Sequence, residues 1–187
     1  MRFVPTSLPG VHLLEPERHA DVRGFFARTW CAGELKEHGL EAELCQASVS
    51  YNHKKGTLRG LHYQAPPHAE VKLVRCTRGA LFDVAVDIRP DSPSFRKWVG
   101  VELTADNGKA LYIPKGFAHG FYTLADATEV EYLISTEYRP EAGRGLRYND
   151  AFFSIAWPGP ADVIAERDSN YPDATLKALE ELRGLKP

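Results

Sequence analysis

The chain has 187 residues, with 23 Lys and Arg against 25 Asp and Glu, which gives a formal net charge of -2. This length and an even composition predict one domain over residues 1–187 with a single buried core. The interspersed charges lack the basic patch of a nucleic-acid-binding protein, and no apolar run reaches membrane-spanning length. We therefore expect no nucleic-acid partner and no membrane partner.

The N-terminus and the cysteines bear on the compartment. Residues 1–5 lack the apolar core of a signal peptide, which predicts a cytoplasmic protein. The three cysteines, Cys31, Cys45 and Cys76, are odd in number and have no CxxC spacing. They indicate neither a disulfide framework nor a zinc site.

Short strands broken by Pro, Gly and Asn/Asp turns dominate the chain. In order, we expect extended segments at 1–9, 11–15, 22–30 and 46–51, two runs within 56–75, and further strands at 80–89, 98–103, 110–113, 121–124 and 129–136. Helical patterning is limited to 34–38, which ends at Gly39, and to 173–182, where Leu176, Leu179 and Leu182 would pack on the sheet. Such strands, without crossover helices, favour an antiparallel sandwich or small barrel.

Residues 56–75 carry more polar chemistry than a structural hairpin requires. The polar residues of this stretch are Arg59, His62, Gln64, His68, Glu70, Lys72 and Arg75. Lys72 lies between Val71 and Leu73 in a strand that is expected to be buried. Charged side chains are rarely buried without a function, so this position favours a functional role for Lys72. Strict alternation would put Arg59 and His62 on opposite faces of the strand. A β-bulge at Gly60 could bring them to the same face, or Arg59 could reach the substrate from the edge of the strand. This stretch is the first candidate for an active site.

The element Pro114-Lys115-Gly116-Phe117-Ala118-His119 is typical of the second motif of cupins, which are double-stranded β-helix barrels with a central cavity. With His62 ahead of a Pro-Pro turn, it predicts two histidines at one barrel mouth. A metal would find too few ligands there unless His68 and Glu70 joined the site. We therefore expect an all-β cupin-type jelly roll with short peripheral helices and no metal.

Several longer runs resemble one family. They are 21–26 (DVRGFF), 56–64 (GTLRGLHYQ), 83–89 (DVAVDIR), 113–121 (IPKGFAHGF), 148–150 (YND) and 155–158 (IAWP). In this order they resemble the dTDP-4-dehydrorhamnose 3,5-epimerase family. The resemblance implies a cupin-type homodimer that inverts C3, C5 or both in a nucleotide-linked 4-keto-6-deoxyhexose.

The chemistry of such a reaction needs no cofactor. A base removes the acidic proton next to the ketone, a cation stabilises the enolate oxygen, and an acid returns a proton from the opposite face. His62 suits the base, and by resemblance Asp168 is the carboxylate that orients it. Lys72 suits the enolate oxygen, with help from His119. The resemblance makes Tyr132 the proton donor.

The same resemblance assigns the residues that hold the substrate. Arginine forks match phosphate geometry, and the remaining groups are assigned to the sugar and the nucleotide base. The set is Arg23, Phe26, Gln46, Ser48, Arg59, His119, Tyr138 and Arg167. Phe25 and Phe26 are also expected at a dimer interface.

Other polar residues have structural interpretations. His12, His19, His38, His53 and His68 are read as ordinary structural histidines. Asp83 and Asp87 share one strand face and are expected to form ion pairs with Arg75 or Arg89.

Some positions depart from the family pattern, and other functions stay open. These positions are Arg28, Ser48, Gly143, Tyr148 and Ala151, all of them outside the catalytic set. Parts of the substrate-holding set therefore differ. A mono-epimerase or ketoisomerase, a non-catalytic sugar-nucleotide-binding cupin and an iron-dependent cupin oxygenase are the alternatives. The intact set of His62, Tyr132 and Asp168 argues against the non-catalytic one.

Overall fold

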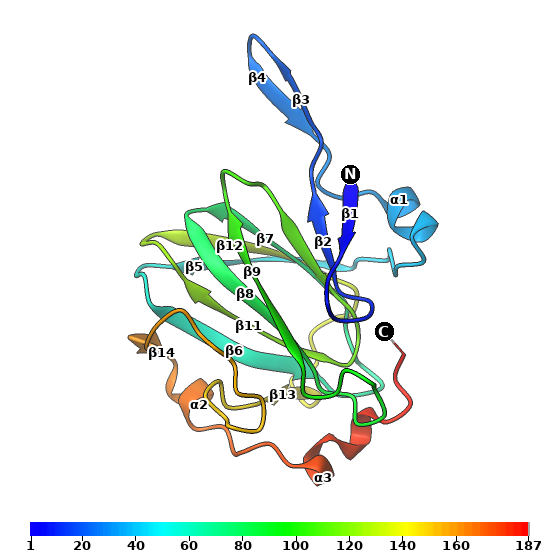
Figure 1. Cartoon of the computed structure of the whole chain (residues 1–187), viewed down its shortest axis with the longest axis vertical. Helices are drawn as coiled ribbons and strands as arrows, with labels where there is room; N and C mark the ends of the chain where they lie inside the picture. The colour runs from blue at the N-terminus through cyan, green and yellow to red at the C-terminus, as the bar shows by residue number, and fades with distance from the viewer. Residues whose placement is uncertain (187) are drawn as a thin grey trace.

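Two antiparallel sheets face each other in the computed structural model, which describes residues 1–186 (Figure 1). Sheet 1 has the order β1 (Arg2–Pro5), β2 (His12–Glu15), β10 (Ala110–Ile113), β7 (Lys72–Arg78), β12 (Thr128–Ile134) and β5 (Gln46–Asn52). Sheet 2 has the order β13 (Gly143–Gly145), β6 (Thr57–Gln64), β11 (Phe117–Thr123), β8 (Ala80–Asp87) and β9 (Trp98–Thr104), with β14 (Val163–Ile164) parallel to β6. The expected all-β jelly roll is confirmed.

A separate hairpin of β3 (Arg18–Asp21) and β4 (Gly24–Ala27) projects from the sandwich (Figure 1). The strand predicted over 22–30 is therefore confirmed only for Gly24–Ala27. The chain turns at Val22 and Arg23, and Gly24 adopts a φ of 128°, which a residue with a side chain rarely takes. Trp30 lies beyond the hairpin.

The helices are short: α1 (Ala32–Glu37), α2 (Glu166–Ser169), α3 (Leu176–Leu179) and the 3₁₀ turn η1 (Glu180–Leu182). The helix predicted over 173–182 begins only at Leu176, where the Thr175 hydroxyl accepts a bond from the Ala178 amide. Leu179 and Leu182 are buried as expected, whereas Leu176 is exposed, because one helical turn followed by a 3₁₀ turn presents fewer residues to the sheet. No helix in residues 1–186 is both long and apolar enough to span a membrane.

Three apolar clusters hold the layers together. The cluster between the sheets includes Val74, Leu111 and Phe121, and the outer face of sheet 1 packs on α1 through Leu35. The outer face of sheet 2 packs on the C-terminal segment that carries Leu179. The space between the sheets is thus filled with apolar side chains over part of its length, and the remainder is open to polar groups.

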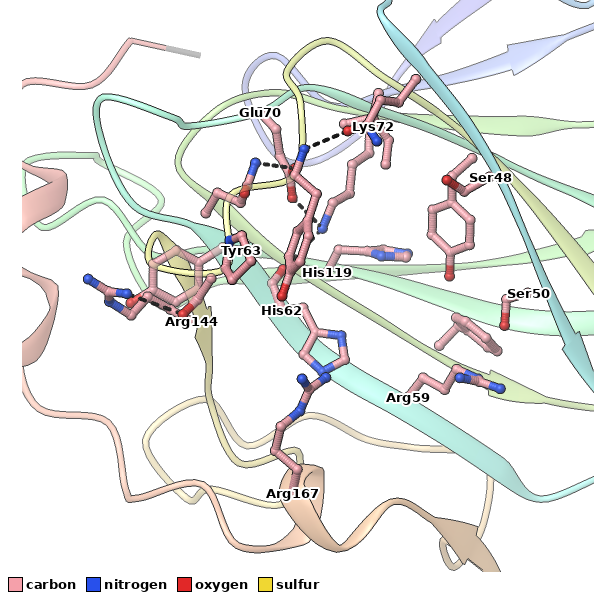
Figure 2. A pocket seen from close by; sticks show the side chains of 18 of the residues that line it. Ser48, Ser50, Arg59, His62, Tyr63, Glu70, Lys72, His119, Arg144 and Arg167 are labelled. Carbon is pink, nitrogen blue, oxygen red and sulfur yellow. Dashed lines mark hydrogen bonds and ion pairs between the residues drawn. The ribbon is translucent and has the colours of Figure 1, made fainter.

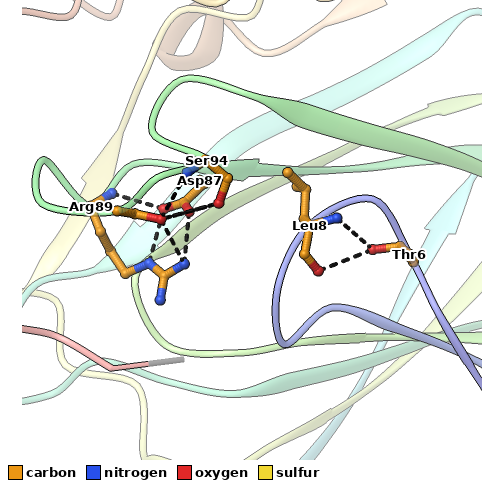
Figure 3. A network of polar contacts seen from close by, with 6 residues as sticks. Thr6, Leu8, Asp87, Arg89 and Ser94 are labelled. Atoms are coloured by element: carbon orange, nitrogen blue, oxygen red, sulfur yellow. Dashed lines mark hydrogen bonds and ion pairs between the residues drawn. The ribbon is translucent and has the colours of Figure 1, made fainter.

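Strand β8 alternates as its sequence predicts, but both of its faces are buried. The apolar face, with Val84 and Val86, packs under the C-terminal segment. The face with Asp83 and Asp87 looks the other way, and Asp87 is held by Arg89, by Ser92 at 2.5 Å and by Ser94 at 2.6 Å (Figure 3). The predicted ion pair of Asp87 with Arg89 is therefore confirmed.

Candidate active site

A cavity of about 580 Å³ opens between the two sheets (Figure 2). Sheet 1 contributes Gln46, Ser48, Ser50, Lys72, Tyr132 and Ile134, and sheet 2 contributes Arg59, His62, Tyr63, Gln64, His119, Phe121, Gly143 and Arg144. Glu70, Tyr138, Pro140, Arg167 and Tyr171 complete the wall from connecting segments and α2. Most of the predicted site residues therefore come together here from segments far apart in the sequence.

His62 and Asp168 form a hydrogen-bonded pair, with 2.9 Å between Nε2 and Oδ1. The other carboxylate oxygen of Asp168 accepts the Gly60 amide at 3.0 Å. Burial alone would raise the pKa of the Asp168 carboxyl, but the bonds from His62 and Gly60 hold that pKa below its ordinary value. Asp168 thus stays ionised and fixes Nε2 of His62 as the protonated nitrogen, which leaves Nδ1 to accept a proton.

A bulge in β6 brings Arg59 and His62 to the same face. His62 pairs with His119, and Arg59 pairs with Phe121. Between these two pairs, β6 therefore contains one residue more than β11, which is the signature of a β-bulge. Gly60 lies in the bulge with a φ of 120°, and a Cβ there would lie 2.6 Å from the Cα of Gly120. Only glycine fits, and of the two expected explanations for Arg59 the bulge is the correct one.

Lys72 is buried at the start of β7 but is not unpaired. Its Nζ lies 3.0 Å from the Glu70 carboxylate and donates to the His62 carbonyl at 3.3 Å. Glu70 is itself held by the Gln64 amide at 2.9 Å. The ion pair with Glu70 therefore holds the Lys72 side chain in its buried position on the cavity wall (Figure 2).

Tyr132 faces the cavity from β12 in sheet 1, across from His62 in sheet 2. Burial, reinforced by the negative charge of Asp83, raises the pKa of its phenol. The phenol is thus held in its protonated form, as a proton donor requires.

His119 lies opposite His62 in the register of β6 and β11 and has its own carboxylate. Its Nε2 is 2.7 Å from Oδ1 of Asp83 on β8. The prediction that Asp83 pairs with Arg75 or Arg89 is wrong, because Arg75 pairs with Glu131 at 2.7 Å and Arg89 pairs with Asp87. The carboxylate of Asp83 instead faces inward, where His119 is the partner within reach.

Several predicted substrate-holding residues lie at the outer part of the cavity. Arg59 donates to the Asn52 amide oxygen at 2.8 Å, and the Gln46 side-chain oxygen accepts the Tyr138 amide at 2.6 Å. Ser48 lines the wall nearby, and Arg167 projects from α2 next to Asp168 (Figure 2). This part of the cavity offers two guanidinium groups that suit phosphate oxygens.

Arg23 and Phe26 do not reach the cavity of their own chain. Both lie on the projecting hairpin, where Arg23 pairs with Asp21 at 2.5 Å and Phe26 is 72% exposed. Within a single chain, these two predicted substrate-binding residues are separated from the rest of the set.

Tyr171 is a cavity residue that the sequence analysis missed. Its ring meets the His62 ring edge to face, with 6.2 Å between centroids, and covers Gly145 so closely that a Cβ there would overlap it. Its position three residues after Asp168, the expected partner of His62, could have indicated that Tyr171 lies near His62. Glu70 was considered only as a metal ligand, although its position two residues before Lys72 on the same face indicated an ion pair.

The fold and this site together define a cupin-type enzyme that moves protons on a bound substrate. The family model described as dTDP-4-dehydrorhamnose 3,5-epimerase matches residues 5–175. A protein of that name from Escherichia coli strain K12 is 45% identical over 189 residues, which cover 100% of this chain and 98% of the relative. The chain belongs to the dTDP-4-dehydrorhamnose 3,5-epimerase family.

Solved structures agree with this family. The dTDP-4-dehydrorhamnose 3,5-epimerase of Bacillus anthracis, crystallised with TDP and PPi bound, superposes with a TM-score of 0.89 at 39% identity, covering 92% of this chain and 99% of that one. ChmJ, a 3'-monoepimerase from Streptomyces bikiniensis in complex with dTDP-quinovose, superposes with a TM-score of 0.86 at 33% identity, covering 96% and 91%. Both double and single epimerases therefore share this architecture.

Proposed function

We propose that the protein epimerises C3, C5 or both in a dTDP-linked 4-keto-6-deoxyhexose, of the type dTDP-4-dehydro-6-deoxyglucose to dTDP-4-dehydrorhamnose. The observation that carries the proposal is the placing of a His–Asp base and a protonated tyrosine on opposite sheets across one cavity. Family membership supports the substrate class, because the related structures hold TDP or dTDP-quinovose.

The first half of the reaction is proton removal. Nδ1 of His62 takes the proton from the carbon next to the ketone, and the electron pair of the C–H bond moves to the carbonyl oxygen to give an enolate. Asp168 stabilises the imidazolium that forms, and the Lys72 ammonium stabilises the enolate oxygen together with His119. No cofactor is needed, since the ketone itself makes the proton acidic.

The second half returns a proton to the other face. The Tyr132 hydroxyl donates its proton to the same carbon, and the enolate electron pair forms the new C–H bond. The phenolate then regains a proton from solvent, and the His62 imidazolium releases to solvent the proton that it took. Because Tyr132 and His62 belong to facing sheets, a sugar lying between them is protonated on the face opposite to the one that lost its proton. Inversion follows from this placement.

The outer part of the cavity suits the nucleotide. Arg59 and Arg167 fit the diphosphate, while Gln46, Ser48 and Tyr138 surround the space for the base. We assign all five to substrate binding.

We further propose that the protein works as a homodimer in which the hairpin reaches the cavity of the second copy. Val22, Phe25 and Phe26 are exposed at 104%, 58% and 72%. Strand β5, an edge of sheet 1, also exposes Val49 and Tyr51, which alternate along the strand with the cavity-lining Ser48 and Ser50. Docking of the hairpin at a second copy would cover this apolar surface and would bring Arg23 and Phe26 to a substrate.

The shared site has a direct test. Arg23→Ala and His62→Ala each remove activity, but unfolding and refolding the two variants together restores about a quarter of the sites, because half of the dimers pair an intact His62 with an intact Arg23. Light scattering checks the mass of the assembly. A mixture without activity would refute the shared site.

A single domain over residues 1–187 and a cytoplasmic location complete the proposal. Three free thiols, one of them exposed at Cys45, suit a reducing compartment. Cell fractionation of the source organism tests the location, and limited proteolysis of the purified protein tests the single domain.

The reaction is tested in deuterated water. The protein is incubated with dTDP-4-dehydro-6-deoxyglucose, and NMR follows deuterium at C3 and C5. Exchange at both carbons is expected of a 3,5-epimerase, and exchange at C3 alone would identify a 3-epimerase such as ChmJ. Exchange at neither carbon would contradict the proposed function.

A further inference from the structure

Two His–Asp pairs lie next to each other in the cavity, and they differ in their surroundings. His62 and His119 are direct partners across β6 and β11, and their carboxylates come from α2 and β8. The His62 side chain is 33% exposed, whereas His119 and Asp83 are exposed at only 4% and 0%. The first pair can exchange protons with solvent, and the second pair is sealed on all sides except the cavity.

The two carboxylates, Asp168 and Asp83, also accept different numbers of hydrogen bonds. Asp168 accepts hydrogen bonds on both oxygens. Asp83 accepts one bond, from His119, and its Oδ2 is buried with no partner among residues 1–186. An ionised carboxylate that is buried with one free oxygen is destabilised unless a positive charge lies beside it, and without such a charge it takes up a proton.

The groups that face the second pair leave one source for that charge. Tyr132 on β12 and Cys76 on β7 are neutral, since burial raises the pKa of the phenol and raises the pKa of the thiol to about 11. The nearby Lys72, His62 and Arg59 have hydrogen-bond partners other than Asp83. Lys72 pairs with Glu70, His62 with Asp168, and Arg59 donates to the neutral amide of Asn52. Among residues 1–186, His119 is the titratable side chain that is hydrogen-bonded to Asp83.

We propose that Asp83 is a positioning residue of the reaction, which holds His119 as an imidazolium and directs its Nδ1–H into the cavity where the enolate oxygen forms. The proposal rests on the proposed epimerase function. Nε2 of His119 is committed to Asp83, and Nδ1 has no protein partner within residues 1–186. Figure 2 shows His119 beside Lys72 and His62 in the same space.

The two pairs then divide the chemistry between them. His62 gains and loses a proton in each turnover, because it is open to substrate and solvent. His119 keeps its proton throughout and donates a hydrogen bond to the oxygen that becomes negative. This fixed donor supplements Lys72, whose charge is shared with Glu70, and no proton passes from His119 to the sugar.

The test removes the charge of Asp83 and keeps its shape. Asp83→Asn is expected to lower kcat about 10²-fold or more with little change in KM, because the lost interaction acts on the enolate and not on the bound ketone. In ¹⁵N-histidine NMR of the unsubstituted protein, with His119 assigned from His119→Gln, both ring nitrogens of His119 are expected to be protonated at about pH 7. In Asp83→Asn at the same pH, the neutral form of His119 is expected to increase.

The matched control is Asp87→Asn, which removes a second buried carboxylate from the same face of β8, four residues away. Asp87 holds Arg89 and not a cavity residue, so this variant is expected to lose thermal stability while kcat and the protonation of His119 stay unchanged. Equal losses of kcat in both variants would show a merely structural role and overturn the proposal.

The NMR measurement decides the matter even if Asp83→Asn fails to fold. A neutral His119 at pH 7 in the unsubstituted protein would overturn the inference whatever the activity. Failure of the proposed function has a different signature: the unsubstituted protein would exchange neither C3 nor C5, while the histidine spectrum would be unaffected.

Discussion

The two walls of the cavity carry different kinds of proton-handling groups. On sheet 2, His62 and His119 are each hydrogen-bonded to a carboxylate, Asp168 and Asp83. On sheet 1, Tyr132 lies in a buried environment that keeps its phenol protonated. In the proposed reaction, His62 with its carboxylate accepts a proton, and burial keeps the Tyr132 phenol protonated until an enolate takes its proton. Under this proposal, the difference between the walls sets the direction in which protons cross the sugar.

The strongest way to break this comparison is to remove the base. His62→Ala removes the proposed base, and we expect deuterium exchange at C3 and C5 to fall by about 10⁴-fold. His53→Ala, on the turn after β5, is the control and should retain full activity, since His53 does not line the cavity. NMR in deuterated water measures both. Full exchange by His62→Ala would contradict the assignment of the base.

Removing the carboxylate behind the base should cost somewhat less. Asp168→Asn can present its NH₂ to Nε2 of His62, which favours the tautomer with its proton on Nδ1, the wrong one for a base. We expect kcat to fall by about 10³-fold. Steady-state kinetics with Glu166→Gln as the control checks the prediction, because Glu166 is exposed at the start of the same helix. Unchanged kcat in Asp168→Asn would rule out the dyad.

On the opposite wall, Lys72→Met tests the enolate stabiliser. Methionine keeps most of the side-chain length and removes the ammonium, so we expect a fall in kcat of about 10²-fold. Lys115→Met is the control, because Lys115 pairs with Glu41 away from the cavity. An equal effect of both substitutions on kcat would show that Lys72 has no special role.

The smallest effect on catalysis is expected from Asp87, which stabilises the sheet that carries the histidines. Burial opposes its ionisation, but Arg89, Ser92 and Ser94 hold the pKa of this carboxyl below its ordinary value. Its stabilisation is therefore fully present above the unfolded pKa of about 3.9 and is lost as pH falls through the lower folded pKa. Asp87→Asn should lower Tm by about 5–10 °C at pH 7.

The pH dependence separates this effect from a general loss of stability. The Tm difference between the unsubstituted protein and Asp87→Asn should narrow as pH falls below about 4, because protonation removes the charge that the substitution removes. Thermal denaturation followed by circular dichroism measures it. A difference that stays constant down to about pH 3 would contradict the role of the ionised carboxylate.

Much of the fold could be predicted from the sequence because strand alternation and turn residues are local signals. The element Pro114 to His119 indicated the cupin barrel, and the spacing along β8 correctly separated its two faces. Alternation could not tell that both faces are buried, since that depends on the C-terminal segment that packs there. The hairpin and the terminal helix were misjudged because Gly24 and Thr175 act through backbone conformation and capping, which hydrophobic periodicity does not report.

Most residues of the site could be predicted, but the hydrogen bonds and ion pairs between them were harder to predict. Asp168 was assigned to His62 by family resemblance, since 106 positions separate the two residues and no periodicity links them. The predicted partner of Asp83 was an arginine, because arginines lie close to Asp83 in the sequence. This prediction was wrong, because β11 pairs with β8 and places His119 next to Asp83. Arg23 and Phe26 lie on the projecting hairpin, away from the cavity of their own chain, and the sequence pattern did not indicate this separation.

The most direct test of the central claim is the ratio of exchange to inversion in Tyr132→Phe. If the base and the acid lie on opposite walls, this variant still removes the proton through His62 and returns deuterium from the same face. The account predicts deuterium incorporation by NMR with little or no epimerised product. Loss of exchange and inversion together, or full inversion without the tyrosine hydroxyl, would contradict the placement of the two groups on opposite faces of the sugar.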